Sequence, residues 1–515
     1  MKNVLEYLEA SAERLPEKTA VIDDKEQCTY KELQNYSRMM GYILSEYSLE
    51  GKPAAVLMKK SVLTLEVFFG TVYAGGFYSL TDPDFPVTRL TEQLKVLEPE
   101  VVITLEEYKD KLLEAGYKGH VVYAEELREN AGKLIEEADS SADRESEIDG
   151  RLAEIRDRAA EASPLYCNFT SGSTGTPKGV LVGHASVISF IDSFTEMFGI
   201  TEEDVLGNQA PFDFDVSVKD IYSTIRKGAT MVIIPTAFFR FPNGVMDMLE
   251  EHKVTTLIWA VSALVLLNRL HEFMYKVPPC INKVLFSGEE MPIKHLTDWM
   301  KVYPEAKFVN LYGPTEITCN CTYYELPEVP APEDKIPSGY VFPGKVIYLM
   351  DEEGRIIPSD TENVTGEICV GGNELALGYY NNAEATGAAF IEIDIDGEKQ
   401  KIYKTGDLGY RAGGLIYFAG RRDFQIKHNG HRIELEEVER ALGSLPGIQQ
   451  ACCIYDHEKY RIIAFCAGTA DKKAVVAGLK EKLPEYSLPN VYKFMEELPL
   501  TKNGKIDRKL LKESR

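Results

Sequence analysis

Short runs of β-branched and apolar residues recur along most of the chain, and amphipathic segments separate them. Four such runs are AAVLM at 54–58, VVIT at 101–104, MVIIP at 231–235 and VLF at 284–286. Strands of parallel sheets are buried on both faces and read as continuous apolar runs, so the alternation predicts an α/β fold in which largely parallel sheets pack with helices.

The chain has 515 residues, which is more than one ordinary hydrophobic core accommodates. The segment 420–442 leads from a Gly- and Arg-rich turn into an expected helix, whose start is rich in glutamate as the helix dipole favours. Two strand-like runs and another helix over 471–483 follow. We therefore expect a large N-terminal domain over 1–422, a hinge at Asp423 and a small α/β domain over 424–515.

The formal charge is −24, and a surface that acidic repels nucleic acid and anionic membranes, so we expect neither as a partner. The longest apolar run, 257–267, is shorter than the roughly 20 residues that cross a bilayer, so we expect no membrane insertion. Acidic residues near the N-terminus exclude a signal peptide, which indicates a cytoplasmic protein. The charged segment 136–163 is predicted to be a solvated helix or connection of unknown role.

The stretch TSGSTGTPKG at 170–179 combines glycines and hydroxyl side chains with one lysine, and apolar runs flank it. We expect it to join the two strands of a hairpin. Glycines let backbone N–H groups approach an anion, and Lys178 adds a charge, which suits phosphate. Composition alone leaves phosphate binding and a mobile loop open.

The same stretch resembles the phosphate loop of the AMP-forming adenylating enzymes, which include acyl-CoA synthetases, luciferases and the adenylation domains of nonribosomal peptide synthetases. Other motifs follow in the order of that family, and together they cover essentially the whole chain. They are TYKEL at 29–33, YAGGFYSLTDPDFP at 73–86, NLYGPTE at 310–316, GEICVGGNELALGYY at 366–380, YKTGDLGY at 403–410, GRRDFQIKHNGHRIELEEVE at 420–439, LPEYSLP at 483–489 and PLTKNGKIDRKLL at 499–511.

The resemblance implies that a substrate carboxylate reacts with ATP to give an acyl-adenylate and pyrophosphate, and that the acyl group then passes to a thiol. Positioning and charge stabilisation would carry such catalysis, since the substrate itself is the nucleophile. The implied metal is Mg²⁺, which prefers oxygen ligands, at Glu316. The C-terminal domain would be a mobile lid.

Roles in binding ATP follow from the resemblance motif by motif. The β- and γ-phosphates would lie against Thr170, Ser171, Gly172, Ser173, Thr174 and Lys178. The adenosine and α-phosphate would be contacted by Asn310, Leu311, Tyr312, Gly313, Pro314, Thr315, Asp407, Phe418, Gly420 and Arg421. Thr315, Glu316 and Lys505 are the implied catalytic residues. Lys505 would bridge the carboxylate and ATP, and rotation about Asp423 would then withdraw it and bring KHNGHR toward the acceptor.

The stretch FDFDVSVKDIYSTI at 212–225 bears on the substrate. Apolar residues at helical spacing predict a helix, and Ser217 with Asp220 resembles a capping box at its start. In the amino-acid-activating branch of the family, an aspartate at the position of Asp215 pairs with the α-ammonium group of the substrate. The alternative is an acidic residue that only complements the helix dipole.

The positions that match the substrate-binding set of the family are mixed in polarity and lack tryptophan, which suits a small or polar amino acid. They are Asp215, Val216, Lys219, Ser262, Leu285, Ser287, Leu311, Cys319, Asn320 and Lys505. Lys219 is unusual. It could face an acidic side chain of the substrate, but we expect it to face Asp220 or solvent.

The likeness is strongest to D-alanine–D-alanyl carrier protein ligases and to nonribosomal adenylation domains. Ser287 stands where those ligases have cysteine, which puts D-alanine in doubt and leaves alanine or serine of either hand open. No G-G-x-S motif of a carrier domain follows any Gly-Gly pair, so we expect a separate carrier protein with a phosphopantetheine arm as the acceptor, with CoA as the alternative acceptor. An acyl-CoA synthetase of a simple carboxylic acid is the alternative.

Overall fold

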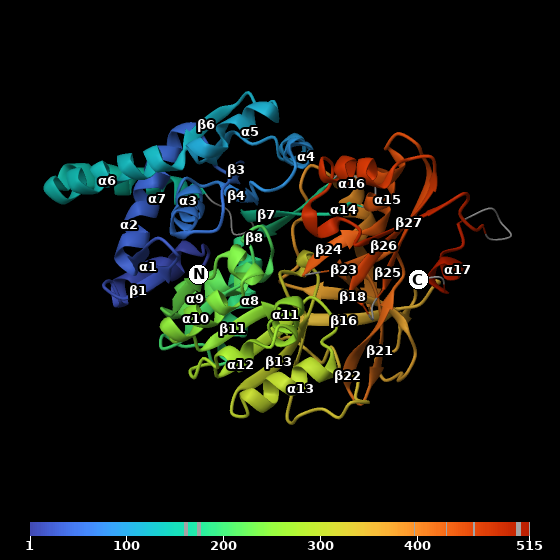
Figure 1. Cartoon of the computed structure of the whole chain (residues 1–515). Helices are drawn as coiled ribbons and strands as arrows, with labels where there is room; N and C mark the ends of the chain where they lie inside the picture. The colour runs from blue at the N-terminus through green and yellow to red at the C-terminus, as the bar shows by residue number, and fades with distance from the viewer. Residues whose placement is uncertain are drawn as a thin grey trace.

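The computed structural model describes residues 1–158, 163–172, 177–395, 397–428, 430–456, 459–500 and 506–513. Helices pack against mixed sheets, and the elements from β23 onward group at one side of the molecule beside β16, β18 and β21 (Figure 1). The predicted α/β class, a large N-terminal region followed by a small C-terminal one, is confirmed. Within the described ranges no helix combines the length and apolar character needed to cross a membrane.

Two sheets of the N-terminal region have parallel centres, as the apolar runs predict. In the first, of order β19-β8-β7-β4-β3-β5-β6, the strands from β7 to β6 are parallel. Its strands are β3 Pro53–Leu57, β4 Phe77–Thr81, β5 Val101–Thr104, β6 His120–Tyr123, β7 Pro164–Thr170, β8 Lys178–Gly183 and β19 Gly378–Tyr379. Strands β7 and β8 are antiparallel, so the hairpin predicted around 170–179 is confirmed.

The second sheet has the order β15-β14-β13-β12-β11-β9-β10-β1-β2, and its strands from β13 to β1 are parallel. Its strands are β1 Thr19–Ile22, β2 Gln27–Thr29, β9 Val205–Asn208, β10 Thr230–Ile233, β11 Thr256–Ala260, β12 Lys283–Ser287, β13 Lys307–Tyr312, β14 Thr322–Glu325 and β15 Tyr340–Val341. The carboxyl ends of its parallel strands therefore share one edge, where α/β folds present ligand-binding loops.

A third, antiparallel sheet completes this region, with the order β17-β16-β18-β21-β20 and β22 paired to β21. Its strands are β16 Lys345–Met350, β17 Ile356–Ile357, β18 Gly366–Gly372, β20 Phe390–Ile395, β21 Glu398–Ala412 and β22 Leu415–Arg421. Strands β21 and β22 pair Asp407 with Arg421, so this sheet brings two expected nucleotide-binding residues together.

Helices cover these sheets, and one hydrophobic cluster links side chains from all three. The helices are α1 Leu5–Arg14, α2 Tyr30–Leu44, α3 Val62–Tyr73, α4 Val87–Leu97, α5 Lys109–Glu114, α6 Ala124–Ser140, α7 Ala142–Arg158, α8 His184–Met197, α9 Val216–Lys227, α10 Asn243–Glu251, α11 Val261–Arg269, α12 Glu272–Tyr275, α13 Ile293–Val302 and α14 Ala383–Ala389. Helix α9 is buried on every side from Val216 to Ile225, which takes even its polar residues out of water.

The C-terminal elements have hydrophobic clusters of their own. They are β23 Gln425–His428, β24 His431–Glu434, α15 Leu435–Gly443, β25 Ile448–Asp456, β26 Arg461–Gly468, α16 Lys472–Lys480, β27 Val491–Met495 and α17 Arg508–Glu513. The part of the segment 420–442 that we expected to lead directly from a turn into the helix is instead a β-hairpin that pairs Ile426 with Ile433, and α15 begins only at Leu435. The boundary at Asp423 stays a prediction.

Two local expectations change. The capping box at Ser217 and Asp220 is wrong: Asp215 is the N-cap residue of α9, the Ser217 hydroxyl donates to the carbonyl oxygen of Phe214 at 2.7 Å, and Asp220 accepts from the Asn208 amide at 2.8 Å. The charged segment 136–163 lies in α6 and α7 as far as residue 158. In α7 only an apolar stripe at Ile148, Leu152 and Ile155 is buried, and the other residues are exposed or half-buried.

Candidate active site

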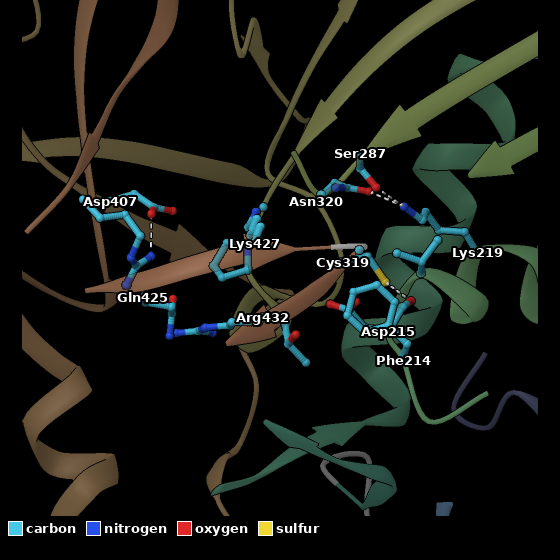
Figure 2. Close-up of a pocket in the computed structure, with 17 residues that line it drawn as sticks. Phe214, Asp215, Lys219, Ser287, Cys319, Asn320, Asp407, Gln425, Lys427 and Arg432 are labelled. Atoms are coloured by element: carbon cyan, nitrogen blue, oxygen red, sulfur yellow. Dashed lines mark hydrogen bonds and ion pairs between the residues drawn. The ribbon is translucent and has the colours of Figure 1, made fainter. Parts of the chain in front are cut away.

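One cavity lies between the carboxyl ends of the central strands of the second sheet and the β23–β24 hairpin (Figure 2). The register of β11, β12 and β13, which pairs Ala260 with Ser287 and Ser287 with Leu311, sets the strand ends side by side. The lining residues are Phe214, Asp215, Val216, Lys219, Ser287, Gly288, Gly313, Pro314, Thr315, Cys319, Asn320, Asp407, Arg421, Gln425, Lys427, Gly430 and Arg432.

Gly313, directly after β13, brings the loop that follows it close to this strand end. A Cβ atom at position 313 would lie 2.5 Å from Cα of Asn320 and 2.7 Å from the carbonyl oxygen of Cys319. No side chain fits in that space, so the backbone requires glycine there. The close approach presents Cys319 and Asn320 to the cavity.

Asp215 lies at the start of α9, and its carboxylate is buried. Burial raises the pKa of Asp215, while Lys219 and the Thr315 hydroxyl oppose the rise. Its backbone carbonyl accepts a hydrogen bond from Sγ of Cys319 at 3.2 Å. A buried carboxylate at the cavity wall suits a cationic ligand, because a buried charge requires a partner.

Lys219 follows one helical turn later and faces the same cavity. Its side chain is only 1% exposed, and Nζ donates to Oδ1 of Asn320 at 2.9 Å and to Oγ of Ser287 at 3.4 Å. Burial lowers the pKa of Lys219. The expectation that it faces solvent or Asp220 is wrong, because α9 is enclosed and Asp220 bonds the Asn208 amide instead.

At the opposite end of the cavity, Asp407 is held by two donors. The Tyr312 hydroxyl donates to Oδ2 of Asp407 at 2.6 Å, and Nη1 of Arg421 donates to Oδ1. The same guanidinium also bonds both carboxylate oxygens of Asp423, with distances of 2.6 and 2.8 Å. The carboxylate of Asp407, which Arg421 fixes across the β21–β22 pair, thus lies beside the aromatic ring of Tyr312. A carboxylate beside an aromatic ring is an arrangement suited to a nucleoside.

Glu316 lies in the short 3₁₀ helix η4 Thr315–Ile317 and is 1% exposed. Nη1 of Arg432 lies 3.0 and 2.9 Å from its two oxygens, and the Tyr379 hydroxyl donates to Oε1 at 2.8 Å. Burial alone would raise the pKa of Glu316, but Arg432 and the tyrosine hydroxyls outweigh it and hold the pKa below its usual range. Glu316 is therefore a buried carboxylate in its ionised form.

The described part of the expected phosphate loop touches the C-terminal elements. The Ser171 hydroxyl donates to the backbone oxygen of Arg432 at 2.9 Å, and the carbonyl oxygen of Gly172 accepts from Arg440 at 3.1 Å. Nζ of Lys178 lies 5.4 Å from the centre of the Tyr379 ring.

A buried lysine supports the loop that carries Cys319 and Asn320. Nζ of Lys345 donates to the carbonyl oxygens of Ile317, at 3.1 Å, and Asn320. The same ammonium group lies 4.7 Å from the centre of the Phe190 ring. Lys345 thereby fixes both ends of the four-residue stretch from Ile317 to Asn320, whose Cys319 and Asn320 line the cavity.

Many of the predicted site residues line the cavity together: Asp215, Val216, Lys219, Ser287, Gly313, Pro314, Thr315, Cys319, Asn320, Asp407 and Arg421. Others do not line it: Thr170, Ser171, Gly172, Lys178, Ser262, Leu285, Asn310, Leu311, Tyr312, Glu316, Phe418, Gly420 and Asp423. Three predicted residues, Ser173, Thr174 and Lys505, lie outside the described residues. The role of each predicted residue stays a prediction.

Sequence reasoning missed some of the lining residues: Phe214, Gly288, Gln425, Lys427, Gly430 and Arg432. Most of them belong to the β23–β24 hairpin, which lies across the cavity with Lys427 between the Asp407 group and the Asn320 group (Figure 2). The motif GRRDFQIKHNGHRIE marked this segment, but only the docking of the hairpin reveals which side chains face inward.

The sequence matches two family models. The model described as AMP-binding enzyme matches residues 8–380, and the model described as AMP-binding enzyme C-terminal domain matches residues 437–505. The first match alone covers more than half of the chain, so the chain belongs to the AMP-binding enzyme family. The predicted superfamily, and the expectation of an adenylating ligase of the nonribosomal type, are confirmed.

Curated relatives include bacitracin synthase 1 of Bacillus licheniformis, which is 32% identical over 520 residues. That match covers 99% of this chain but only 9% of the relative, so the chain spans a small part of such synthases. Zwittermicin A synthase ZmaJ of Bacillus cereus is 30% identical over 525 residues, and the match covers 99% of this chain and 94% of the relative.

A solved structure with the same fold is the Vibrio cholerae adenylation domain AlmE in complex with glycyl-adenosine-5'-phosphate. It has a TM-score of 0.84 and 19% identity, with coverage of 100% of this chain and 98% of the other. Holo-PA1221, a nonribosomal synthetase protein containing adenylation and PCP domains, has a TM-score of 0.79 and 22% identity, with coverage of 99% and 84%. At these identities the likeness shows the fold alone.

Proposed function

We propose that the protein activates a small or polar α-amino acid with ATP as an aminoacyl-AMP, releases pyrophosphate, and then transfers the aminoacyl group to the phosphopantetheine thiol of a separate carrier protein. One observation carries the proposal: a single cavity has the buried carboxylate of Asp215 at one end and, at the other, Asp407, which accepts a hydrogen bond from the Tyr312 hydroxyl behind it. An ammonium group suits the first, and ribose hydroxyls suit the second.

In the first step, an oxygen of the amino acid carboxylate attacks the α-phosphorus of ATP and pyrophosphate leaves. In the second, the thiol sulfur attacks the activated carbonyl carbon and AMP leaves. The protein supplies position and charge, with Thr315 beside the α-phosphate and Lys505 bridging the carboxylate and ATP. The loop from Thr170 to Lys178 would grip the β- and γ-phosphates.

The chemistry of Glu316 fits a magnesium ion, because an ionised, buried carboxylate is an oxygen donor of the kind Mg²⁺ prefers. When bound, the ion would neutralise phosphate charge. In the arrangement described, both carboxylate oxygens accept from Arg432, so the metal and the guanidinium would occupy Glu316 in turn.

Two arrangements of the C-terminal elements would serve the two steps, with Asp423 as the hinge. Lys505 would approach for adenylation. In the described arrangement Lys427 and Gly430 line the cavity, and the amide of Gly430 donates to Glu289 at 2.8 Å. We assign this arrangement to aminoacyl transfer.

The relatives support an amino acid and a carrier as substrates: AlmE was solved with a glycyl adenylate, and holo-PA1221 contains a PCP domain. D-alanine ligation is a narrower version of the same activity, which Ser287 disfavours. The acyl-CoA synthetase alternative has no use for a buried carboxylate at position 215.

The test is pyrophosphate exchange with every L- and D-amino acid, followed by loading of a phosphopantetheinylated carrier protein. We expect exchange that depends on one amino acid or a narrow set, and its loss in Asp215→Ala. Exchange that depends on acids without an amino group, and that Asp215→Ala retains, would instead establish the acyl-CoA synthetase. Absence of exchange with any acid would overturn the proposed activity.

A further inference from the structure

The substrate end of the cavity contains an ammonium group that has only neutral hydrogen-bond partners. Nζ of Lys219 bonds Asn320 and Ser287, and across the described ranges no carboxylate lies within 4.0 Å of it as an ion-pair partner. Burying a charge costs free energy unless an opposite charge lies beside it. The enclosed position of Lys219 therefore calls for an anion.

The two acids nearest to Lys219 along α9, Asp215 and Asp220, form no ion pair with it. Asp220 accepts from the Asn208 amide. The Lys60 ammonium group lies among the backbone oxygens of residues 208–210, 2.8 Å from that of Gln209. Asp215 is the group we assign to the α-ammonium of the substrate. Once an amino acid is bound, Asp215 has its own counter-charge and Lys219 has none.

The two neutral partners of Lys219 are arranged to help bind an acceptor. Oγ of Ser287 accepts from Lys219, which leaves the Ser287 hydroxyl proton to donate elsewhere. Oδ1 of Asn320 also accepts from Lys219, which leaves its amide protons to donate. Both residues line the cavity, so three donors converge at its substrate end.

We propose that the amino acid activated here carries a carboxylate in its side chain, as aspartate and glutamate do, and that Lys219 binds that carboxylate with Ser287 and Asn320. The inference rests on the proposed function and specifies its substrate. Asp215, the N-cap residue of α9, and Lys219 lie about one helical turn apart. The carboxylate of Asp215 would therefore face the α-ammonium group of the ligand, and the ammonium group of Lys219 would face the side-chain carboxylate of the same ligand.

Neutral amino acids would leave this end of the cavity incomplete. Asparagine and glutamine offer a carbonyl acceptor but no negative charge, and alanine or glycine offers neither. A site that hydrogen-bonds a substrate group rejects analogues that lack it far more strongly than an apolar site rejects a missing methylene. We therefore expect activation to follow the order acidic, then amide, then small apolar.

The experiment compares wild type, Lys219→Met and Lys227→Met in pyrophosphate exchange with L- and D-aspartate, glutamate, asparagine, glutamine, alanine and serine. Lys227 lies at the end of the same helix, away from the cavity, and serves as the matched control. Met has about the length of Lys without its charge. We expect Lys219→Met to lower kcat/KM for the acidic amino acid by about 100-fold, the size expected when a charged hydrogen bond is lost, with less than a threefold change in Lys227→Met.

A second measurement separates folding from recognition. Unfolding temperatures, and calorimetric affinity for ATP alone, should be unchanged or raised in Lys219→Met, since an apolar side chain replaces a buried unpaired charge. Exchange that favours a neutral amino acid in wild type would overturn the inference and leave the proposed function intact. So would equal loss for acidic and neutral amino acids in Lys219→Met. No exchange with any amino acid would overturn the proposed function itself.

Discussion

Nη1 of Arg432 lies 3.0 Å from Oε1 and 2.9 Å from Oε2 of Glu316, so a strand of the C-terminal hairpin holds the carboxylate that the family resemblance assigns to magnesium. The carboxylate of Glu316 is 1% exposed, and the side chain of Arg432 is 18% exposed. Removing one partner of a buried ion pair leaves the other without compensation. This contact is therefore the strongest single candidate for stabilising the docked hairpin.

Replacing Arg432 by Gln should impair transfer more than adenylation. Loss of one partner of a buried pair costs about 3–5 kcal/mol, so we expect aminoacyl transfer to a carrier to fall by at least about 100-fold. Pyrophosphate exchange should change by less than about threefold, and half-maximal exchange should need less Mg²⁺, because a competitor for Glu316 is gone. Arg461→Gln, which breaks an ion pair with Asp456 between β25 and β26, is the control. Equal losses in both steps would contradict the assignment.

Asp407→Asn should weaken nucleotide binding, because Asp407 would accept the ribose hydroxyls at the cavity wall. Loss of a hydrogen bond to a charged group costs about 1.5–3 kcal/mol, so we expect KM for ATP to rise by roughly 10- to 100-fold while KM for the amino acid changes little. Asp423→Asn is a matched comparison, since Asp423 bonds the same Arg421 guanidinium but does not line the cavity. An equal rise of KM for ATP in both variants would show that Arg421, and not the ribose, explains the effect.

Acid should weaken the docking of the β23–β24 hairpin through His431. Its ring stacks on Tyr486 at 3.7 Å and lies 5.9 Å from the Phe214 ring, measured between ring centres. Burial, with a smaller contribution from His428, lowers the pKa of His431 to about 4. A histidine with a lowered pKa contributes its full stabilisation above its ordinary pKa of about 6.5, and this is lost as pH falls toward 4.

The measurement for His431 is limited proteolysis between the two regions, followed from pH 7 to pH 4.5. We expect cleavage to increase on acidification in wild type and to depend less on pH in His431→Phe, which keeps the stacking without a titrating group. Because carboxylates also titrate near pH 4.5, the difference between the two proteins is the quantity that counts. Identical profiles would exclude His431 as the cause.

Lys345→Met should disturb the amino acid more than the nucleotide. The ammonium group fixes the carbonyl oxygens of Ile317 and Asn320, and the stretch between them presents Cys319 to the cavity. Losing these hydrogen bonds costs about 1–3 kcal/mol, so we expect KM for the amino acid to rise by about tenfold or more, with KM for ATP within about threefold. The exposed Lys399→Met on β21 is the control. A parallel rise of both KM values would indicate general destabilisation.

The sequence predicted the sheet architecture well because burial on both faces leaves a local trace in it. The runs at 54–58, 101–104, 231–235 and 284–286 all lie in or at parallel strands of the structure. The β7–β8 hairpin was also predictable, since its turn residues stand between two apolar runs. Apolar runs and helix periodicity are properties of neighbouring residues, so they can be read directly from the sequence.

Several of the wrong expectations depend on tertiary contacts. Ser217 was expected to cap α9, but its hydroxyl donates to the carbonyl oxygen of Phe214. Asp220 accepts instead from the amide of Asn208, which lies on β9. Lys219 was expected near solvent, and only the enclosure of α9 between layers puts it among Ser287 and Asn320. The inward side chains of the hairpin, such as Lys427, depend on how the C-terminal region docks, and no periodicity encodes that.

The contacts of Ser171 and Gly172 with Arg432 and Arg440 have a consequence for timing. Arg432 of β24 contacts both the loop expected to bind the departing phosphates and the carboxylate expected to hold their metal, and Arg440 of α15 contacts the loop as well. We therefore expect the closing of the hairpin and the presence of pyrophosphate to exclude each other. Pyrophosphate, the product of the first reaction, would then inhibit the second reaction. Transfer from the aminoacyl-adenylate would begin only after pyrophosphate has dissociated.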